Sequence, residues 1–510
     1  MFILSRYRHT ICIAEDERVE INKKSFKQTE IIKRIVTAGF KTDAALEEGA
    51  VDKIISATAT CRVKSVTAGE AGAEASIRAR ITVLYLTPEG ETDRYESGVD
   101  FSVLIPFDGA YKGEPLVDVT VDEVRVSSQP GGFGVTATVT AEAKFAVEKE
   151  FFYIEDADGL VVKKAEFSAL NEICRKCDAF EVEEEKTYNY VIKKILYSCE
   201  TARIISAQCG VDSVICDCEV AGELLILTAD GEEIRENTAF TFRIEQECEG
   251  VSPDLSCYGD VRVCGANFRV ETVDDSANST VTFGYSLKFY TVVYSQEQLE
   301  CVDDCFSLTN QIKTEAEEYA VVSSAEQKTF KSKAFGEAVC AKDGEIKKVL
   351  GSCIDGLNYS VGGEKLVVSG VLKTEIVALN QNGEYAKTCC ELPFSLEFSP
   401  VCAVADLECF VRGVTVKEFD GKVMAEGEIT VIVLDEKPCA RKFITAIEEG
   451  EAKPLDDGAV SLIFVKRGET AWDVCKKAGV SERELLSQSG ETEFPASKDY
   501  SIAVYRRIDI

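Results

Sequence analysis

Histidine is almost absent from this sequence of 510 residues, since His9 is its one histidine. Acid–base or triad catalysis that depends on an imidazole would therefore rest on one residue close to the N-terminus. The sequence also lacks the patterns GxxxxGK[ST], GxSxG and HExxH, which mark phosphate-binding, nucleophile and zinc-protease sites. Carboxylate runs such as Glu181–Glu185 are typical of a solvated face. We therefore expect no catalytic residues and no enzyme activity.

Long apolar runs and an excess of basic residues are missing as well. No stretch approaches the roughly 20 apolar residues of a membrane span, and the N-terminus holds no run of signal-peptide length, so we expect synthesis in the cytosol. The 57 basic residues are outnumbered by 89 acidic ones, for a net charge of −32. Such a surface repels phosphate backbones and anionic lipid, which disfavours nucleic-acid binding and basic-patch membrane attachment. The acidity either suits a cationic partner or only keeps the protein in solution.

Cysteine, in contrast, is frequent, with 21 residues. In a cytosolic chain these start as thiols, and their odd number leaves at least one without a partner in the chain. The pairs Cys174/Cys177 and Cys301/Cys305 have zinc-ligand spacing, but a whole predicted domain separates them, so we predict no metal and no cofactor. Most others sit in or beside strand patterns and are interpreted as small core residues, with cross-linking between proteins as the functional alternative.

One block of sequence occurs three times. The copies run over Val83–Phe107, Leu224–Glu245 and Ile376–Phe398. In each copy a phenylalanine stands eleven positions after a glycine: Gly90 and Phe101, Gly231 and Phe242, Gly383 and Phe394. The three glycines are 141 and 152 residues apart, which is domain size, so the pattern predicts tandem domains and not a solenoid.

Each copy has the pattern of a β-hairpin. Apolar and β-branched runs flank the turn sequences TPEG, TADG and NQNG, where glycine supplies a positive φ. A second block follows, in which Val135, Ala137 and Val139 alternate with threonines, so one face of that strand should point inward. The predicted fold class is mainly β, with three tandem sandwich-like or barrel-like domains before a small C-terminal unit.

The predicted boundaries follow from these blocks. We place the domains at residues 1–150, 151–297 and 298–440, a linker at 441–459 and the C-terminal unit at 460–510. Two segments rich in Glu and Lys, Phe167–Tyr197 and Gln298–Ser332, are interpreted as short helices or extended connectors.

The C-terminal unit differs from the rest in charge and in pattern. It has eight basic and eight acidic residues, which leaves 49 basic and 81 acidic residues in the preceding chain. Ser461–Val465 is a strand pattern, Thr470 and Asp473 have the spacing of a capping box, and Gly479 is a helix-ending residue. A second capping box begins a second helix at Ser481, and Tyr500–Tyr505 is a strand pattern. The order is therefore β-α-α-β.

The stretch FVKRGETAWDVCKKAGVSERELL resembles the LysM module, and the match covers residues 461–505. The resemblance implies a shallow groove between the loop after the first strand and the loop before the last. Its candidate contact residues are Gly468, Glu469, Thr470, Trp472, Ser489, Gly490, Phe494 and Lys498. Trp472, the sole tryptophan, either lines that groove or covers the small core. LysM modules usually bind glycans that contain N-acetylglucosamine, but the second loop lacks the family's asparagines and Pro-Gly pair, and some such modules hold proteins.

The repeats resemble the SPOCS domains of SipL-type spore-coat morphogenetic proteins, which also end in one LysM module. The blocks VLYLTPEG…DFSVLIPF and LNQNGE…LPFSLEF carry this likeness. It implies a non-enzymatic scaffold in spore-coat assembly, located in the mother-cell cytoplasm, at the forespore surface or in the coat. Its LysM module would engage the coat ATPase SpoIVA or a similar coat protein. The alternative is a peptidoglycan-binding protein with the repeats as spacers, and a coat-associated enzyme is a third hypothesis.

Overall fold

The computed structural model describes residues 20–45, 51–129, 132–272, 278–341, 344–380, 382, 385–453, 460–489 and 493–505. Strands make up 82% of the structure and helices 3%, which confirms the predicted mainly β class with a small helical part near the C-terminus. His9, Gly383 and Gly490 lie outside the described residues. None of the helices in the described ranges is both long and apolar enough to cross a membrane.

One strand order occurs three times along the described chain, and we name the three units the first, second and third repeats. The first repeat comprises β1 (Glu20–Ala45), β2 (Lys53–Gly69), β3 (Gly72–Leu86), β4 (Thr92–Pro106), β5 (Lys112–Gln129) and β6 (Gly132–Asp158). The second comprises β7 (Val161–Tyr188), β8 (Ile192–Cys209), β9 (Ser213–Thr228), β10 (Glu233–Glu247), β11 (Ser256–Thr272) and β12 (Ser279–Phe306). The third comprises β13 (Asn310–Glu337), β14 (Val339–Cys340), β15 (Glu345–Gly362), β16 (Lys365–Leu379), β17 (Tyr385–Phe398), β18 (Val404–Phe419) and β19 (Lys422–Ala452).

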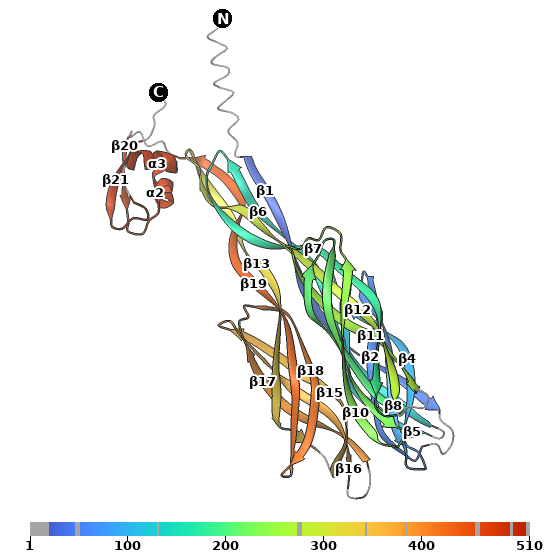
Figure 1. Ribbon diagram of the computed structural model, residues 1–510. Helices are drawn as coiled ribbons and strands as arrows, with labels where there is room; N and C mark the ends of the chain where they lie inside the picture. Colours follow the sequence, from blue (N-terminus) through green and yellow to red (C-terminus); the bar gives the residue numbers. More distant parts are fainter. Residues whose placement is uncertain are drawn as a thin grey trace.

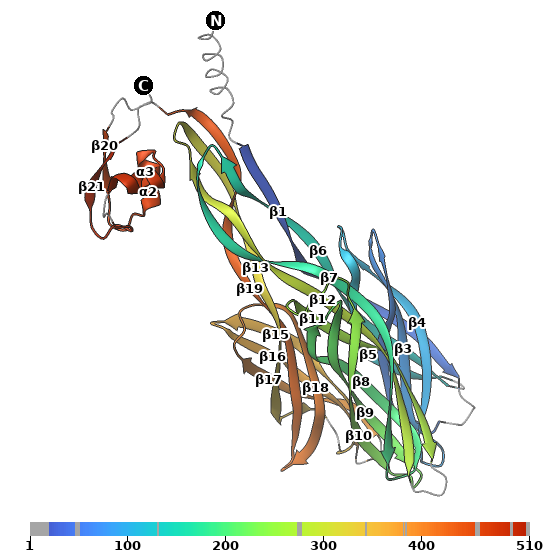
Figure 2. The same cartoon turned by 45° about the horizontal axis from the view of Figure 1, so that its top comes forward.

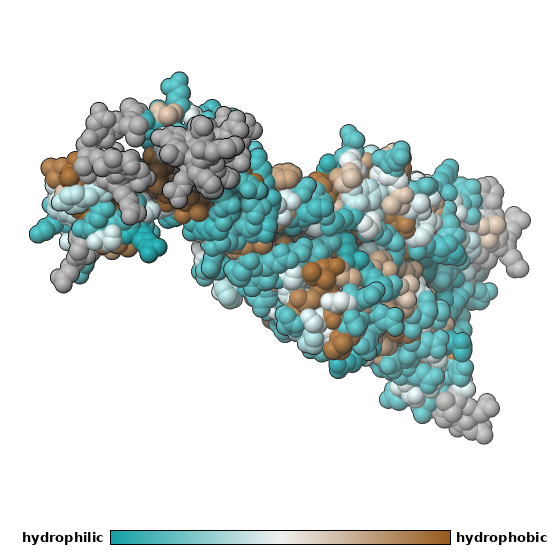
Figure 3. Space-filling model, turned by 90° about the horizontal axis from the view of Figure 1, so that it is seen from above, coloured by the Kyte–Doolittle hydropathy of each residue, from teal (hydrophilic) through white to brown (hydrophobic). Residues whose placement is uncertain are grey.

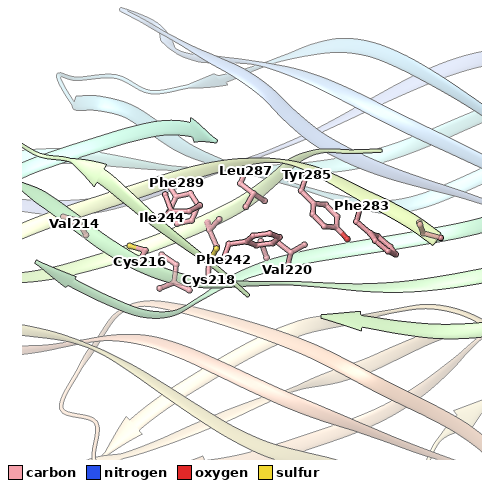
Figure 4. Close-up of a cluster of buried hydrophobic side chains, with 14 of the residues drawn as sticks. Val214, Cys216, Cys218, Val220, Phe242, Ile244, Phe283, Tyr285, Leu287 and Phe289 are labelled. Atoms are coloured by element: carbon pink, nitrogen blue, oxygen red, sulfur yellow. The ribbon is translucent and has the colours of Figure 1, made fainter. Parts of the chain in front are cut away.

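Each repeat folds into two antiparallel sheets. In the first, β2-β3-β4 is a meander, while β6 pairs with both β1 and β5. The second repeat has the same arrangement in β8-β9-β10 and β7-β12-β11, and the third has it in β15-β16-β17 and β13-β19-β18, with β14 added beside β17. The two sheets of the second repeat enclose a core in which Cys216, Phe242 and Phe283 are buried (Figure 4). The repeats are therefore sandwich-like.

The hairpins and the alternation were predicted correctly. Gly90 and Gly231 lie in the turns of β3–β4 and β9–β10 with φ of 83° and 81°. In β6, Val135, Ala137 and Val139 are buried while the intervening threonines face outward. Period-two alternation thus selects the face that enters the core.

Of the two interpretations of the Glu- and Lys-rich segments, short helices are wrong, whereas the extended conformation agrees with the structure. Phe167–Tyr197 lies mainly in β7 and β8, and Gln298–Ser332 mainly in β12 and β13, so neither segment is helical. The expected linker continues β19 as far as Ala452, and positions 150, 297 and 440 fall inside β6, β12 and β19. The reason is that these strands run beyond the sandwiches, where one face is solvated and its charges obscure the alternation.

The long strands form a stalk. The antiparallel strand pairs β1/β6, β7/β12 and β13/β19 converge above the three sandwiches (Figures 1 and 2). Inside, Phe167 contacts Phe26 and Phe443, with ring centroids 5.6 and 4.9 Å apart, so each repeat contributes at least one aromatic ring. Burial of three such rings, at roughly 1.5–3 kcal/mol each, holds the repeats together at this level.

The first and last strands of every repeat meet at the stalk tip. Glu20 pairs with Asp158, Val161 with Phe306, and Asn310 with Ala452. The chain therefore enters and leaves each repeat at the same end.

A second apolar junction joins the repeats at the level of the sandwiches. Each repeat contributes two equivalent side chains: Ile55 and Leu84, Leu196 and Leu225, Leu350 and Val377. Together with the stalk core, this junction makes the three repeats one approximately threefold body.

The C-terminal unit, which we name the tail, follows the stalk. It comprises β20 (Val460–Val465), α2 (Ala471–Ala478), α3 (Glu482–Ser489) and β21 (Tyr500–Tyr505) in the predicted β-α-α-β order. Gly479 ends α2 with φ 65°, which is the left-handed conformation expected there.

Candidate functional site

The loop between β20 and α2 is held by short-range hydrogen bonds. Thr470 caps α2, because its side chain accepts from the Asp473 N–H while the Asp473 carboxylate accepts from the Thr470 N–H. Glu469 is bonded by the Lys477 ammonium and by the Lys466 N–H, and these bonds lower the pKa of the Glu469 carboxyl. The N-terminus of a helix favours such acidic side chains. The loop is thus a rigid turn and not a loose connection.

The loop before β21 lies against this turn. Gly468 donates its N–H to the Ala496 carbonyl at 2.8 Å, and Ala496 donates back to the Glu469 carbonyl at 2.9 Å. Phe494 is half-buried in the tail core, whereas Lys498 is exposed. The structure therefore brings Gly468 and Glu469 beside the second loop, as the LysM resemblance implies.

Two other candidate residues lie at the ends of the tail helices. Thr470 serves as the helix cap, and Ser489 ends α3. Their role in ligand contact stays a prediction.

Trp472 faces the repeats. Its indole N–H donates to the Asp304 carboxylate at 2.8 Å, and its ring meets Phe306 edge-on with centroids 5.2 Å apart. Lys476, one turn further along α2, bonds the same carboxylate. Burial works against the charge on Asp304, but the bonds from Lys476 and Trp472 outweigh it and lower the pKa of that carboxyl. Trp472 therefore covers the hydrophobic core of the tail, which is one of its two predicted roles, and this core also includes Phe306 at the end of β12.

The second repeat alone has the residues for this contact. In the stalk, Tyr153, Cys301 and Phe443 occupy equivalent positions in β6, β12 and β19. By the same spacing, the equivalents of Asp304 are Asp156 and Ala446, and those of Phe306 are Asp158 and Glu448. Of the three equivalent strand ends, those of β6, β12 and β19, only that of β12 has a carboxylate followed by a phenyl ring two residues later. Asp304 belongs to the segment CVDDC, which was interpreted only as a possible zinc-ligand pair of cysteines.

The tail sheet leaves one apolar face uncovered. Val460, Leu462 and Phe464 of β20 are 50%, 75% and 55% exposed, and Tyr505, opposite Val460 in β21, is 58% exposed. Directly opposed residues of antiparallel strands point to the same side, so these four side chains form one surface, which we name the outer face. Viewed from above, hydrophobic surface occurs in small patches, one of which lies on the tail (Figure 3). Contiguous exposed apolar side chains of this kind mark contact surfaces.

A cluster of buried and half-buried charges lies where the three repeats meet. The Arg262 guanidinium in β11 bonds Asp118 of β5 at 2.6 Å, Asp260 at 2.5 Å and Glu408 of β18. Lys144 of β6 adds a bond to Asp406 at 2.5 Å. Every repeat therefore supplies at least one carboxylate to the Arg262 and Lys144 cations.

The charges of this cluster perturb one another. Burial opposes the charge on Asp118 and Glu408, but Arg262 outweighs it and lowers the pKa of both carboxyls. Asp260 behaves oppositely: burial raises its pKa well above the ordinary value, and its Oδ2 has no hydrogen-bond partner. A cavity of about 500 Å³ beside the cluster is lined by all three repeats. Because Arg262 and Lys144 already bind the carboxylates of this cluster, we infer that the cluster holds the three repeats together.

The cysteine pairs considered for zinc lie in different strands, β7 and β12. Among the residues that the structure describes, no group of three or more His, Cys, Asp or Glu side chains is placed to hold a metal ion.

Comparisons of this chain with protein-family models, with curated proteins and with solved structures found no match.

Proposed function

We propose that this protein is a non-enzymatic scaffold or adaptor in spore-coat assembly. Its tail docks onto a coat morphogenetic partner, for which the LysM and SPOCS resemblances suggest the ATPase SpoIVA. The single observation that carries the proposal is the outer face of the tail. The location that the resemblance implies is the mother-cell cytoplasm, the forespore surface or the coat.

The physical support lies in the contrast between the tail and the repeats. Protein interfaces are depleted of charge at their centre and enriched in aromatic side chains, and Leu462, Phe464 and Tyr505 meet that description. The tail is charge-balanced, whereas the chain before it carries the whole net charge of −32. A partner can therefore approach the tail with less long-range repulsion than it meets at the repeats.

The docking test uses the full chain and purified SpoIVA. We expect Leu462→Glu to weaken binding at least tenfold, because it places a charge in the centre of the outer face. The matched control is Leu104→Glu in β4, where a leucine is 57% exposed on the first repeat, and its affinity should stay within twofold of wild type. Equal binding by all three proteins would refute docking through the outer face.

Glycan binding is the second candidate function, and one observation favours it. The turn at Gly468 and the loop at Ala496 are joined by two hydrogen bonds, so the two loops that form the LysM groove lie side by side. Titration of the full chain with a chitin-type oligosaccharide tests this. Binding of the sugar without binding of SpoIVA would replace the docking proposal with attachment to peptidoglycan or another N-acetylglucosamine glycan.

A further inference from the structure

Two thiols face each other across adjacent strands of the third repeat. Cys340 in β14 and Cys390 in β17 are direct partners in the antiparallel register. Their Sγ atoms are 2.7 Å apart, about 0.7 Å more than the ~2.05 Å of a disulfide bond. Opposed residues in antiparallel strands have Cα atoms about 4.5–5.5 Å apart, which is inside the range that disulfides span. A bond between these sulfurs therefore requires little movement of the backbone.

We propose that Cys340 and Cys390 are a redox modification site, which closes to a disulfide by exchange with a low-molecular-weight disulfide such as oxidised glutathione. The Cys340 thiolate attacks one sulfur of the small disulfide, and the other half leaves as a thiolate. The Cys390 sulfur then attacks Cys340 and releases the second half, while the protons of the two protein thiols pass to the leaving thiolates. Two protein thiols are oxidised and one small disulfide is reduced to two thiols.

Exposure fixes the order of these two steps. Cys340 is only half-buried and lies in a two-residue strand at the edge of its sheet. Cys390 is 1% exposed and belongs to the core of the third repeat. A small disulfide can reach the edge strand but not the core, so the Cys340 thiolate attacks it first and Cys390 resolves the mixed disulfide.

Other thiol contacts are less suited to exchange. Cys209 and Cys257 are hydrogen-bonded to each other, as are Cys174 and Cys248. Burial raises the pKa of the Cys257 thiol and raises that of Cys248 to about 12. Since the thiolate is the attacking species, Cys257 and Cys248 are poor attacking thiols at neutral pH.

The bond would lie within one sheet of the third repeat, beside the point where the chain crosses over from the other sheet. Ala338 donates its N–H to the carbonyl of Val423 at the start of β19, in one sheet, at 2.8 Å. Two residues later Cys340 pairs with β17 in the other sheet. A disulfide here fixes the point at which the chain crosses from one sheet to the other.

The test oxidises the full chain with glutathione disulfide and maps it by mass spectrometry after digestion with trypsin without reductant. We expect one linked species of peptides 334–342 and 388–412, two hydrogens lighter than their sum and lost on addition of dithiothreitol. Fragmentation should place the link at Cys390 and not at Cys389. Absence of this species, or a link at Cys389, would overturn the proposal.

Alanine variants provide the matched control, because Cys389 is the chain neighbour of Cys390 and points to the opposite face of the strand. Cys389→Ala should keep the link, whereas Cys340→Ala and Cys390→Ala should each lose it. Far-UV circular dichroism verifies that each variant is folded. A link that survives Cys390→Ala would also overturn the assignment.

Discussion

Removal of the Arg262 guanidinium should destabilise the whole three-repeat body. Arg262→Met keeps much of the side-chain volume but leaves the Asp118 and Glu408 carboxylates without their main cation. Removing one partner of a buried ion pair costs about 3–5 kcal/mol. Lys144 compensates only in part, because its ammonium is 3.6 Å from Glu408 and already bonds Asp406. We therefore expect the free energy of unfolding to fall by about 3–5 kcal/mol at pH 7.

The pH dependence provides an independent check of this reasoning. In the wild type the pKa values of Asp118 and Glu408 are lowered, so their stabilising contribution is full above the unfolded values and is lost as pH falls through the folded ones. In Arg262→Met the same carboxyls lack the guanidinium, so their pKa values rise and protonation relieves the unpaired charge. The stability difference between the two proteins should therefore shrink as pH falls from 7 to 5.

Urea unfolding followed by far-UV circular dichroism measures both effects. The control is Arg125→Met, whose side chain is 75% exposed and pairs with Glu123 on the surface. Its stability should stay within about 0.5 kcal/mol of wild type. A loss below 1 kcal/mol for Arg262→Met, or an equal loss at pH 5 and pH 7, would refute the assignment of Arg262 as the bond between repeats.

Three further predictions concern the tail and the third repeat. Trp472→Ala should weaken the packing of the tail against the end of β12 by about 2–4 kcal/mol, since it removes a charge-assisted hydrogen bond to Asp304 and an aromatic contact. Faster amide exchange at residues 303–306 would detect this change. Gly479→Ala should lower the free energy of unfolding of the tail by about 1 kcal/mol, because φ is 65° at this position. An added Cβ meets no atom within 4 Å, so conformational strain is the only cost. The fluorescence of the single tryptophan during urea unfolding measures this change. Oxidation of Cys340 and Cys390 closes a loop of roughly 50 residues and should stabilise the third repeat by about 4 kcal/mol, which dithiothreitol should reverse in a urea titration.

Features with a local sequence signal were predictable. The turn glycines Gly90 and Gly231, and the Thr470–Asp473 capping box, have partners within a few residues, so the hairpins and α2 could be located from the sequence. The stalk was missed because its strands carry a solvated, charged face that hides the period of two.

Contacts between distant residues had no such signal. Arg262 meets Asp118 and Glu408 across 144 and 146 residues, and Trp472 meets Asp304 across 168. Nothing near any of these residues indicates its partner, because the contact exists only once the repeats have packed. The LysM resemblance predicted that the loop before α2 and the loop before β21 lie together, as their hydrogen bonds show, but it did not indicate that Trp472 faces the end of β12.

The pairing of the first and last strands of each repeat also has a mechanical meaning. The tail sits at the stalk tip, and the sandwiches, with some of their turns, lie at the other end of the molecule (Figure 1). A tension between a partner held by the tail and neighbours attached at those turns acts along the strands and across their hydrogen bonds, which are perpendicular to the strand direction. Such a load is shared by many bonds at once instead of opening them one by one. We therefore expect the three repeats to be stiff along the strand direction and to transmit tension with little extension.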